Sequence, residues 1–330
     1  MEATPRLDAE YVLPIRREPD DPDDGLDGYL AQISAWLDVT VVDGSDPDAF
    51  QRNADSWRTL VRHIAPDSRA GTNGKVRGVM TGLRHARHDC VVVADDDVRY
   101  SYAALRRMVD ELQRADIVRP QNYFLERRWH TQWDTARTLI NRALGSDYPG
   151  TLGVRRALVL SAGGYSADVL FENLELLRTV KAAGGAELRA DDLFVGRTAP
   201  TASKFFAQRV RQAYDDFAQP ARLVAELSLL ALFLWAVRRP ARLGLLAGST
   251  CLVAAAGRRR AGGGEVFPAS SVLWAPVWLV ERAVCVWLAA VALLRGGARY
   301  RGQRVRIAAT PLRELRRRQA ADHRDDRGDL

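Results

Sequence analysis

The sequence predicts an α/β fold, a mostly parallel sheet covered by helices on both faces, followed by C-terminal membrane-associated helices. The first observation is that short apolar runs alternate with helical patterns in the front half of the 330 residues. The second is that three long apolar stretches follow residue 220. The third is charge: residues 1–203 contain 26 Lys and Arg against 31 Asp and Glu, whereas residues 204–330 contain 22 against 10.

The front half provides the strands and helices of the predicted sheet. Apolar runs predict strands, and apolar residues at helical spacing, such as Leu26, Leu30 and Ile33, predict helices. The predicted strands are 11–15, 39–42 and 90–94, and the predicted helices are 26–37, 56–64, 76–86 and 102–115. A dense turn signal, residues 43–47, ends the second strand.

Acidic residues follow two of these strands, at the edge where sheets of this kind bind ligands. Asp43 ends the second strand, and Asp95, Asp96 and Asp97 follow the third. In extended geometry Asp95 and Asp97 point the same way and could hold Mg²⁺ or Mn²⁺ with a diphosphate. A helix N-cap explains Asp97 equally well, and an Asx-turn is the alternative for Asp43.

The back half contains apolar runs at 223–237, 243–256 and 272–294. We expect the first two to form a helical hairpin in the bilayer and the third, with Pro276 and three tryptophans, to be a kinked or in-plane interfacial helix. A helical soluble subdomain is the alternative. Three domains follow: an α/β domain at 1–218, membrane hairpin and interfacial helices at 219–307, and a basic or disordered cytoplasmic tail at 308–330.

The surplus of arginine in the back half fits a membrane surface better than nucleic acid, because the arginines flank apolar helices and no DNA-binding motif is present. The first ten residues contain no apolar signal region. We therefore expect the plasma (inner) membrane as the location, with the front domain in the cytoplasm and membrane lipids as partners.

Short motifs in the front half occur in the order found in one enzyme family. They are Val12-Leu13-Pro14-Ile15 with Glu18, Val41-Val42-Asp43-Gly44-Ser45, Gly74-Lys75 with Gly82-Leu83-Arg84-His85-Ala86, Asp95-Asp96-Asp97, residues 149–156, and Gly163-Gly164-Tyr165. Together they resemble family 2 glycosyltransferases, which have the Rossmann-like GT-A fold. The three aspartates stand where that family has its Asp-x-Asp metal motif.

The resemblance implies an enzyme that uses a nucleotide-diphosphate sugar. It assigns donor-binding positions to Pro14, Glu18, Asp43, Lys75 and Asp95, and positions for Mg²⁺ or Mn²⁺ to Asp95 and Asp97. Asp43 and Glu18 would contact the base, and Lys75 would lie near the nucleotide. As a residue alone, Lys75 also fits a solvated surface charge.

The family's catalytic base is an Asp that follows a Glu, but here the segment reads Phe171-Glu172-Asn173. An amide does not act as a general base at neutral pH. We therefore assign the base to Glu172, with Asp168 and Glu175 as weaker candidates. A carboxylate that stabilises a helix N-terminus is the alternative for Glu172.

Two further segments resemble membrane-bound members of the family. Gln208-Arg209-Val210-Arg211-Gln212 is similar to the Gln-x-x-Arg-Trp motif, which implies that Arg211 neutralises the diphosphate and that Gln208 lines the site. An amphipathic interfacial helix is the alternative. Residues 297–302 resemble the ending of ceramide-glucosyltransferase-like enzymes, which implies a lipid acceptor. Candidate acceptor contacts are then residues 121–124 and Trp129-His130.

The predicted function is membrane-associated transfer of a hexose from a nucleotide-diphosphate sugar to a lipid or lipid-linked envelope acceptor, with inversion and a divalent metal. The alternative is a catalytically weak GT-A protein that binds nucleotide sugar or scaffolds envelope polysaccharide assembly. Asn173 supports the alternative.

Overall fold

The computed structural model describes residues 5–17, 25–68, 71–145 and 147–328, with side chains to residue 321. The chain forms two compact units. Unit 1 contains Met1–Pro120, Pro149–Val195 and Thr310–Leu330, and unit 2 contains Gln121–Tyr148 and Gly196–Ala309. The predicted division into domains at residues 218 and 307 stays a prediction.

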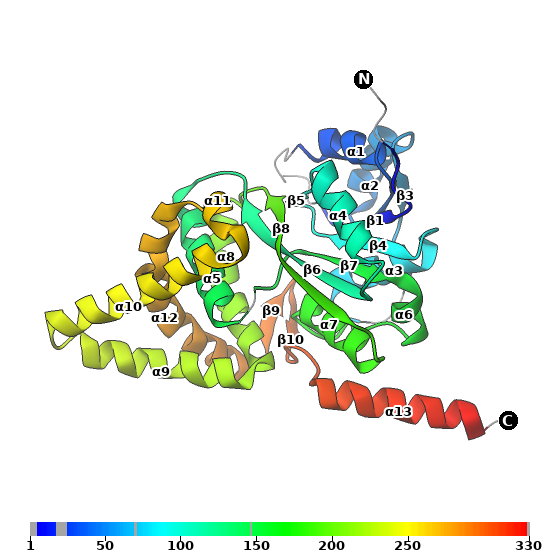
Figure 1. The fold of residues 1–330 in the computed structure, drawn as a ribbon. Coiled ribbons are helices and arrows are strands. Elements are labelled where there is room, and N and C mark those ends of the chain that lie inside the picture. Colours follow the sequence, from blue (N-terminus) through cyan, green and yellow to red (C-terminus); the bar gives the residue numbers. More distant parts are fainter. Residues whose placement is uncertain (1–4, 18–24, 69–70, 146, 329–330) are drawn as a thin grey trace. The chain divides into compact units, whose positions relative to one another are not determined.

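An eight-stranded sheet with the order β3-β2-β1-β4-β7-β6-β8-β5 has most of its strands in unit 1 (Figure 1). The pairs β1–β2, β1–β4 and β2–β3 are parallel, and β7 is antiparallel to β4 and β6. The predicted α/β class is confirmed. The strands are β1 (Glu10–Ile15), β2 (Asp38–Asp43), β3 (Arg62–Ile64), β4 (Cys90–Ala94), β5 (Val98–Arg99), β6 (Ile117–Phe124), β7 (Thr151–Arg155) and β8 (Glu187–Arg197).

Several helices of unit 1 pack against this sheet, and the packing of one of them positions the site. Helix α3 packs on β1 and β2, where Gly82 faces Val12 and Gly78 faces Pro14. A Cβ at Gly78 would lie 2.8 Å from Pro14 Cβ, so the small residues let the helix approach the strand closely. The helices are α1 (Leu26–Ser34), α2 (Pro47–Trp57), α3 (Gly74–His85), α4 (Tyr102–Glu111), α6 (Arg156–Ser161), α7 (Glu172–Ala182) and α13 (Leu312–Gly328).

One predicted helix is wrong. Residues 56–64 contain the end of α2, a turn and strand β3. Helix α2 begins earlier because Asp46, which we assigned to a turn, accepts a hydrogen bond from Ala49 N as the N-cap, with Pro47 in the first turn. His63 and Ile64 join the sheet parallel to Val41 and Val42, and this pairing overrides the local helical spacing.

Unit 2 is mainly helical. Helix α5 packs against α10 and α12, and α12 also packs against α8 and α9. Its elements are α5 (Trp129–Leu144), α8 (Ala202–Tyr214), η1 (Asp215–Ala218), α9 (Pro220–Ala236), α10 (Pro240–Arg259), η2 (Arg260–Gly262), α11 (Gly263–Val266), η3 (Ala269–Trp274), α12 (Ala275–Leu294), β9 (Ala298–Tyr300) and β10 (Gln303–Val305).

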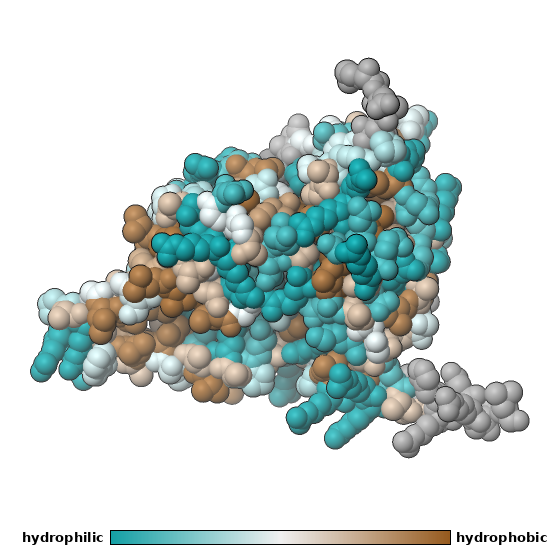
Figure 2. All heavy atoms as spheres, in the orientation of Figure 1, coloured by the Kyte–Doolittle hydropathy of each residue, from teal (hydrophilic) through white to brown (hydrophobic). Residues whose placement is uncertain are grey.

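Within the described residues of unit 2, two segments are long and apolar enough to cross a membrane by length and composition, Pro240–Val266 and Ala269–Leu294. Only 17% of the first apolar window and 33% of the second are buried. Figure 2 shows brown, apolar spheres over α9, α10 and α12, and teal spheres at the turn between α9 and α10. That turn contains Arg238 and Arg239.

These segments differ from the expected hairpin of residues 223–237 and 243–256. Helix α9 has only 17 residues, whereas the third apolar run lies in one of the two candidate spans. Pro276 does not kink this run, because it occupies the first turn of α12, where its missing N–H costs no hydrogen bond. In the tail, residues 312–328 form helix α13, and the expected disorder of residues 308–330 stays a prediction.

Candidate active site

Lys75 joins two acidic residues that are far apart in the sequence. Its Nζ lies 2.5 Å from Asp95 Oδ1, just after strand β4, and 2.7 Å from Glu172 Oε1, in the first turn of α7. Burial lowers the pKa of Lys75, but the two carboxylates outweigh it and raise the pKa above its ordinary value. Lys75 is therefore held as an ammonium ion. Three of the predicted site residues meet here in unit 1.

The N-terminus of α3 fixes the position of Lys75. Asn73 is the N-cap: its Oδ1 accepts a hydrogen bond from Lys75 N, and its Nδ2 donates to Val169 O. Asp168, the weaker candidate for the base, accepts a hydrogen bond from Thr72 N at 3.1 Å. The segment before α7 is thus tied to the segment before α3, which brings Glu172 to Lys75.

Asp95 lies against a glycine. Its backbone N donates to Gly150 O at 2.8 Å, and a Cβ at Gly150 would lie 2.6 Å from Asp95 Oδ2. The expectation that Asp95 and Asp97 point the same way in an extended segment is wrong, because residues 96–97 form a turn that Val98 N closes on Asp95 O. Among the described residues, no three His, Cys, Asp or Glu side chains form a cluster able to hold a metal.

Lys75, Asp95 and Glu172 together are called the Lys75 centre, and Asn173 and Tyr165 lie next to it. Asn173 Nδ2 donates to Pro149 O at 2.9 Å, so the amide that replaces the family's Asp links α7 to the segment before β7. Burial raises the pKa of Tyr165, Lys75 lowers it, and the nearby Glu172 and Asp95 raise it further. The phenol therefore lies within electrostatic reach of all three charges.

Asp43 is buried at the end of β2, and both of its carboxylate oxygens accept hydrogen bonds from the protein. Oδ1 accepts from Ser45 N in an Asx-turn, and Oδ2 accepts from Asn53 Nδ2 at 2.7 Å and lies 3.0 Å from His63 Nε2. Burial raises the pKa of Asp43, but these hydrogen bonds together lower it below its ordinary value. Asp43 is thus an anion that orders the β2–α2 loop.

Two other predicted donor contacts lie near the opening strand. Pro14 of β1 pairs with Val42 of β2 and lies beyond residues 10–12, the part of β1 that pairs with β4. The strand therefore tolerates the missing N–H of Pro14. Glu18 lies outside the described residues.

Gln208 and Arg211 lie on α8 of unit 2. The Arg211 guanidinium lies over the Tyr300 ring, 5.5 Å from its centroid. Arg209, between them, is the buried member of the motif and contacts Asp134 at 3.0 Å. Among the candidate acceptor contacts, His130 is buried and its Nε2 lies 2.9 Å from Pro200 O, the arrangement of a packed histidine.

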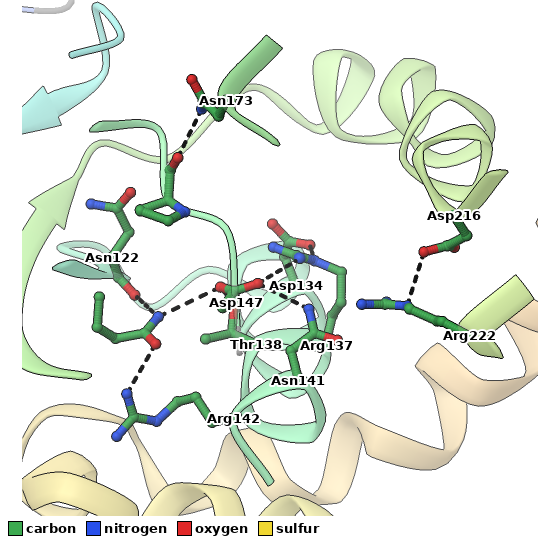
Figure 3. Close-up of polar contacts among 12 residues, drawn as sticks. Asn122, Asp134, Arg137, Thr138, Asn141, Arg142, Asp147, Asn173, Asp216 and Arg222 are labelled. Atoms are coloured by element: carbon green, nitrogen blue, oxygen red, sulfur yellow. Dashed lines mark hydrogen bonds and ion pairs between the residues drawn. The ribbon is translucent and has the colours of Figure 1, made fainter. Parts of the chain in front are cut away.

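A buried polar cluster lies elsewhere in unit 2. Figure 3 shows the carboxylate of Asp147 facing Arg137, Thr138 and Asn141, at 2.9–3.0 Å. Burial raises the pKa of Asp147, and Arg137 with the hydrogen bonds lowers it below its ordinary value. Gln121, a candidate acceptor contact, accepts from Arg142 at 2.9 Å. We interpret this cluster as structural, because each of these groups already has a protein partner.

Sequence reasoning missed four features: the ion pair between Lys75 and Glu172, and the positions of Tyr165, Asn53 and His63. Tyr165 ends the Gly163-Gly164-Tyr165 motif, which was a usable signal. His63 was hidden by the wrong helix. Nothing local to Lys75 or Glu172 indicates their pairing, because it depends on the return of the chain at residues 167–172.

The comparisons with known proteins agree with the class of enzyme that the sequence predicts. Residues 12–156 match the family model described as Glycosyl transferase family 2, which is less than half of the chain. The match includes Asp43, Lys75 and Asp95 and ends before Glu172. It supports glycosyltransferase as the class of the matched domain. A comparison with the curated proteins finds no match.

Solved structures of glycosyltransferases are similar to the chain. A mannosyltransferase from Pyrobaculum calidifontis, solved with GDP-Man and Mn²⁺, is 21% identical, with 86% of this chain and 87% of that chain covered and a TM-score of 0.49. TarS from S. aureus, residues 1–349, is 12% identical, with 62% and 64% covered and a TM-score of 0.42. GalNAc-T7 with UDP, GalNAc and Mn²⁺ is 13% identical, with 59% and 44% covered and a TM-score of 0.40.

Proposed function

We propose that the protein is a membrane-associated glycosyltransferase that transfers a hexose from a nucleotide-diphosphate sugar to a lipid or lipid-linked envelope acceptor, with inversion. The observation that supports this best is the Lys75 centre. It places a cation between Asp95, on the proposed diphosphate side, and Glu172, the proposed base. The family match over residues 12–156 supports the donor class.

The proposed reaction needs one base and a stabilised leaving group. Glu172 takes the proton of the acceptor hydroxyl, whose oxygen forms a bond to the anomeric carbon while the bond from that carbon to the diphosphate oxygen breaks. The electron pair of the broken bond leaves on the nucleoside diphosphate. Lys75 is a fixed cation beside Asp95, suited to stabilising this developing negative charge.

A divalent ion, Mg²⁺ or Mn²⁺, bound together with the donor is part of this proposal. Asp95 has one oxygen on Lys75, and its other oxygen occupies the space that a side chain at Gly150 would fill. Asp95 and Asp97 would hold the ion, because one or two carboxylates with substrate phosphates are the usual ligands of Mg²⁺. The ion would neutralise charge on the diphosphate.

A second function has a specific observation in its favour. Asn173, at the position of the family's base, donates to Pro149 O, a structural role. This supports a catalytically weak protein that binds nucleotide sugar or scaffolds envelope polysaccharide assembly. The two functions share the donor site and differ in turnover.

The decisive experiment is a donor screen with Mn²⁺ on the full chain. Binding and hydrolysis of UDP-, GDP- and dTDP-hexoses are measured with the native protein and with Glu172→Gln. If Glu172 is the base, the substitution leaves donor binding intact and lowers turnover by about 10²–10⁴. Binding without turnover in the native protein would favour the scaffold, and absence of binding would exclude both functions.

Membrane association rests on unit 2, and the location at the inner membrane with a cytoplasmic catalytic domain is part of the proposal. The support is the pair of apolar segments, whose side chains are mostly uncovered by protein. Fractionation of expressing cells tests it. Helices embedded in the bilayer predict that the protein stays with the membranes in high salt and alkaline carbonate, whereas release by salt alone would indicate a peripheral protein held by its arginines.

A further inference from the structure

The hairpin of β9 and β10 follows directly on α12, the helix of the second candidate span (Figure 1). Two glycines with positive φ join the helix to the hairpin. Gly296 N donates to Leu293 O, and Gly297 N donates to Ala292 O, which is the Schellman arrangement at a helix end. A side chain at Gly297 would collide with Val305 O, so this glycine also lets the helix end approach β10 closely. The hairpin therefore has a fixed place at the end of α12.

This part of the chain is strongly basic. Residues 295–306 contain no Asp or Glu and five arginines, all exposed: Arg295, Arg299, Arg301, Arg304 and Arg306. Within the described residues, none of the five forms an ion pair with a carboxylate. Arg304 Nη1 donates to Gly297 O at 3.1 Å, a contact that also complements the negative end of the helix. Capping of α12 thus accounts for one guanidinium and leaves the other four without a protein anion.

The register of the hairpin places two of these arginines together. Arg299 lies directly opposite Arg304 in the antiparallel pair, and the neighbouring pair of Ala298 and Val305 faces the other way. Ala298 and Val305 are buried, so they form the inner face and the two arginines form the outer face. Like charges directly opposite each other destabilise a strand pair. An anion bound between the two guanidinium groups removes this repulsion.

Exposed apolar side chains lie on both sides of the arginines along the chain. Leu294, at the end of α12, is 87% exposed, and Ile307, after β10, is 51% exposed. Arginines next to apolar side chains suit the boundary of a bilayer, where the apolar groups enter the hydrocarbon and the guanidinium groups stay at the level of the phosphates. A nucleic-acid surface would instead need exposed aromatic rings for stacking, and the single aromatic residue of the hairpin, Tyr300, lies on its inner face.

We propose that the β9–β10 hairpin docks on anionic phospholipids of the bilayer, with Arg299 and Arg304 sharing the phosphate of one headgroup. The planar guanidinium matches the oxygens of a phosphate, which makes arginine suited to this contact. The inference rests on the membrane association proposed above for unit 2. It does not depend on the donor site or on sugar transfer. It adds a preference for lipids of negative charge to the contact between apolar helices and hydrocarbon.

The test measures the lipid selectivity of the full chain reconstituted in phosphatidylcholine vesicles. Electron paramagnetic resonance gives the fraction of a trace of spin-labelled phosphatidylglycerol, or of spin-labelled phosphatidylcholine, that the protein immobilises. We expect phosphatidylglycerol to be preferred at least about threefold, and Arg299→Gln with Arg304→Gln to lower that preference at least about twofold. The matched control is Arg106→Gln with Arg114→Gln, which removes two exposed arginines from unit 1 and should leave the preference unchanged.

A charge-conserving variant separates charge from structure. Arg299→Lys with Arg304→Lys keeps both positive charges and should retain the preference, and circular dichroism checks that each variant is folded. An unchanged preference in the glutamine variant, an equal loss in the lysine variant, or removal of the preference by single-stranded RNA at physiological salt would each overturn the proposal.

Flotation of the same vesicles separates this inference from the proposed function. The native chain and both variants should stay with phosphatidylcholine vesicles, because the apolar helices hold them there. A native chain that leaves these vesicles would overturn the membrane association and this inference together. A chain that stays with the vesicles but shows no preference for phosphatidylglycerol would overturn this inference alone.

Discussion

The ammonium of Lys75 keeps two carboxylates together in a setting where they would otherwise repel each other. The side chains of Lys75, Asp95 and Glu172 are 17%, 26% and 19% exposed, so water screens their charges only in part. A cation in this place holds the two carboxylates together and, under the proposed function, attracts the anionic donor. Loss of the Lys75 ammonium should therefore weaken donor binding more than it affects other properties of the protein.

Lys75→Met should weaken binding of a nucleotide-diphosphate sugar by about tenfold or more, because it removes a positive charge from the diphosphate side of the site. Isothermal titration calorimetry in the presence of Mn²⁺ measures the change. Lys204→Met, at an exposed position on α8, is the control and should bind the donor normally. Unchanged affinity in Lys75→Met would remove this lysine from the donor site.

At the scale of elements, the N-terminus of α3 positions Lys75 next to the start of α7. Asn73 caps the helix and also binds Val169 O, so one side chain sets the start of α3 and the approach to α7. Asn73→Ala should lower the free energy of unfolding by about 1–3 kcal/mol, as lost caps and unpaired buried groups do. Urea denaturation measures this.

Asn73→Asp separates the two roles of this side chain. It retains the capping oxygen and loses the N–H that binds Val169 O. We expect an intermediate stability together with weakened donor binding. Stability equal to that of the native protein in both variants would show that the cap has no influence on the fold.

Much of this element layout could be predicted from the sequence, for a physical reason. Strands β1, β2 and β4 contain the short, mainly apolar runs 11–15, 39–42 and 90–94, which predict strands from their own pattern. Asp43 ends β2 and Asp95 follows β4, at the strand ends where sheets of this kind bind ligands. Strand β3 could not be predicted, since its three residues are specified by pairing with β2 and not by their own pattern. The same holds for the Lys75–Glu172 pair, which forms only when the chain returns after β7.

At the scale of the whole chain, His88 ties together separate segments of unit 1. It lies 2.7 Å from Asp8 and 3.0 Å from Asp38. Burial lowers the pKa of His88, but the two carboxylates raise it above its ordinary value near 6.5. The hydrogen bond from His88, despite partial burial, lowers the pKa of Asp38. The stabilisation is therefore complete below pH 6.5 and is lost as the pH rises through the folded-state pKa of His88.

His88→Gln should lower the melting temperature at pH 5.5 by about 1–3 °C and by less at pH 9, because the ion pairs are partly exposed and each is worth under about 1 kcal/mol. Differential scanning fluorimetry across this range measures the difference. The exposed His85→Gln is the control and should show no such pH dependence. An effect of His88→Gln that is as large at pH 9 as at pH 5.5 would contradict the proposed role of charge.

Thr310 links the end of the chain to α7 in unit 1. Its N–H donates to the fully buried Glu175 at 2.6 Å, and its carbonyl oxygen accepts from Arg178, so the last part of unit 1 is completed by residues that the ribosome adds after α9, α10 and α12. Until then Glu175 is a carboxylate without this donor, and α7 lacks the cover of α13. The helix that carries Glu172 therefore reaches its final packing only after the apolar helices have been synthesised.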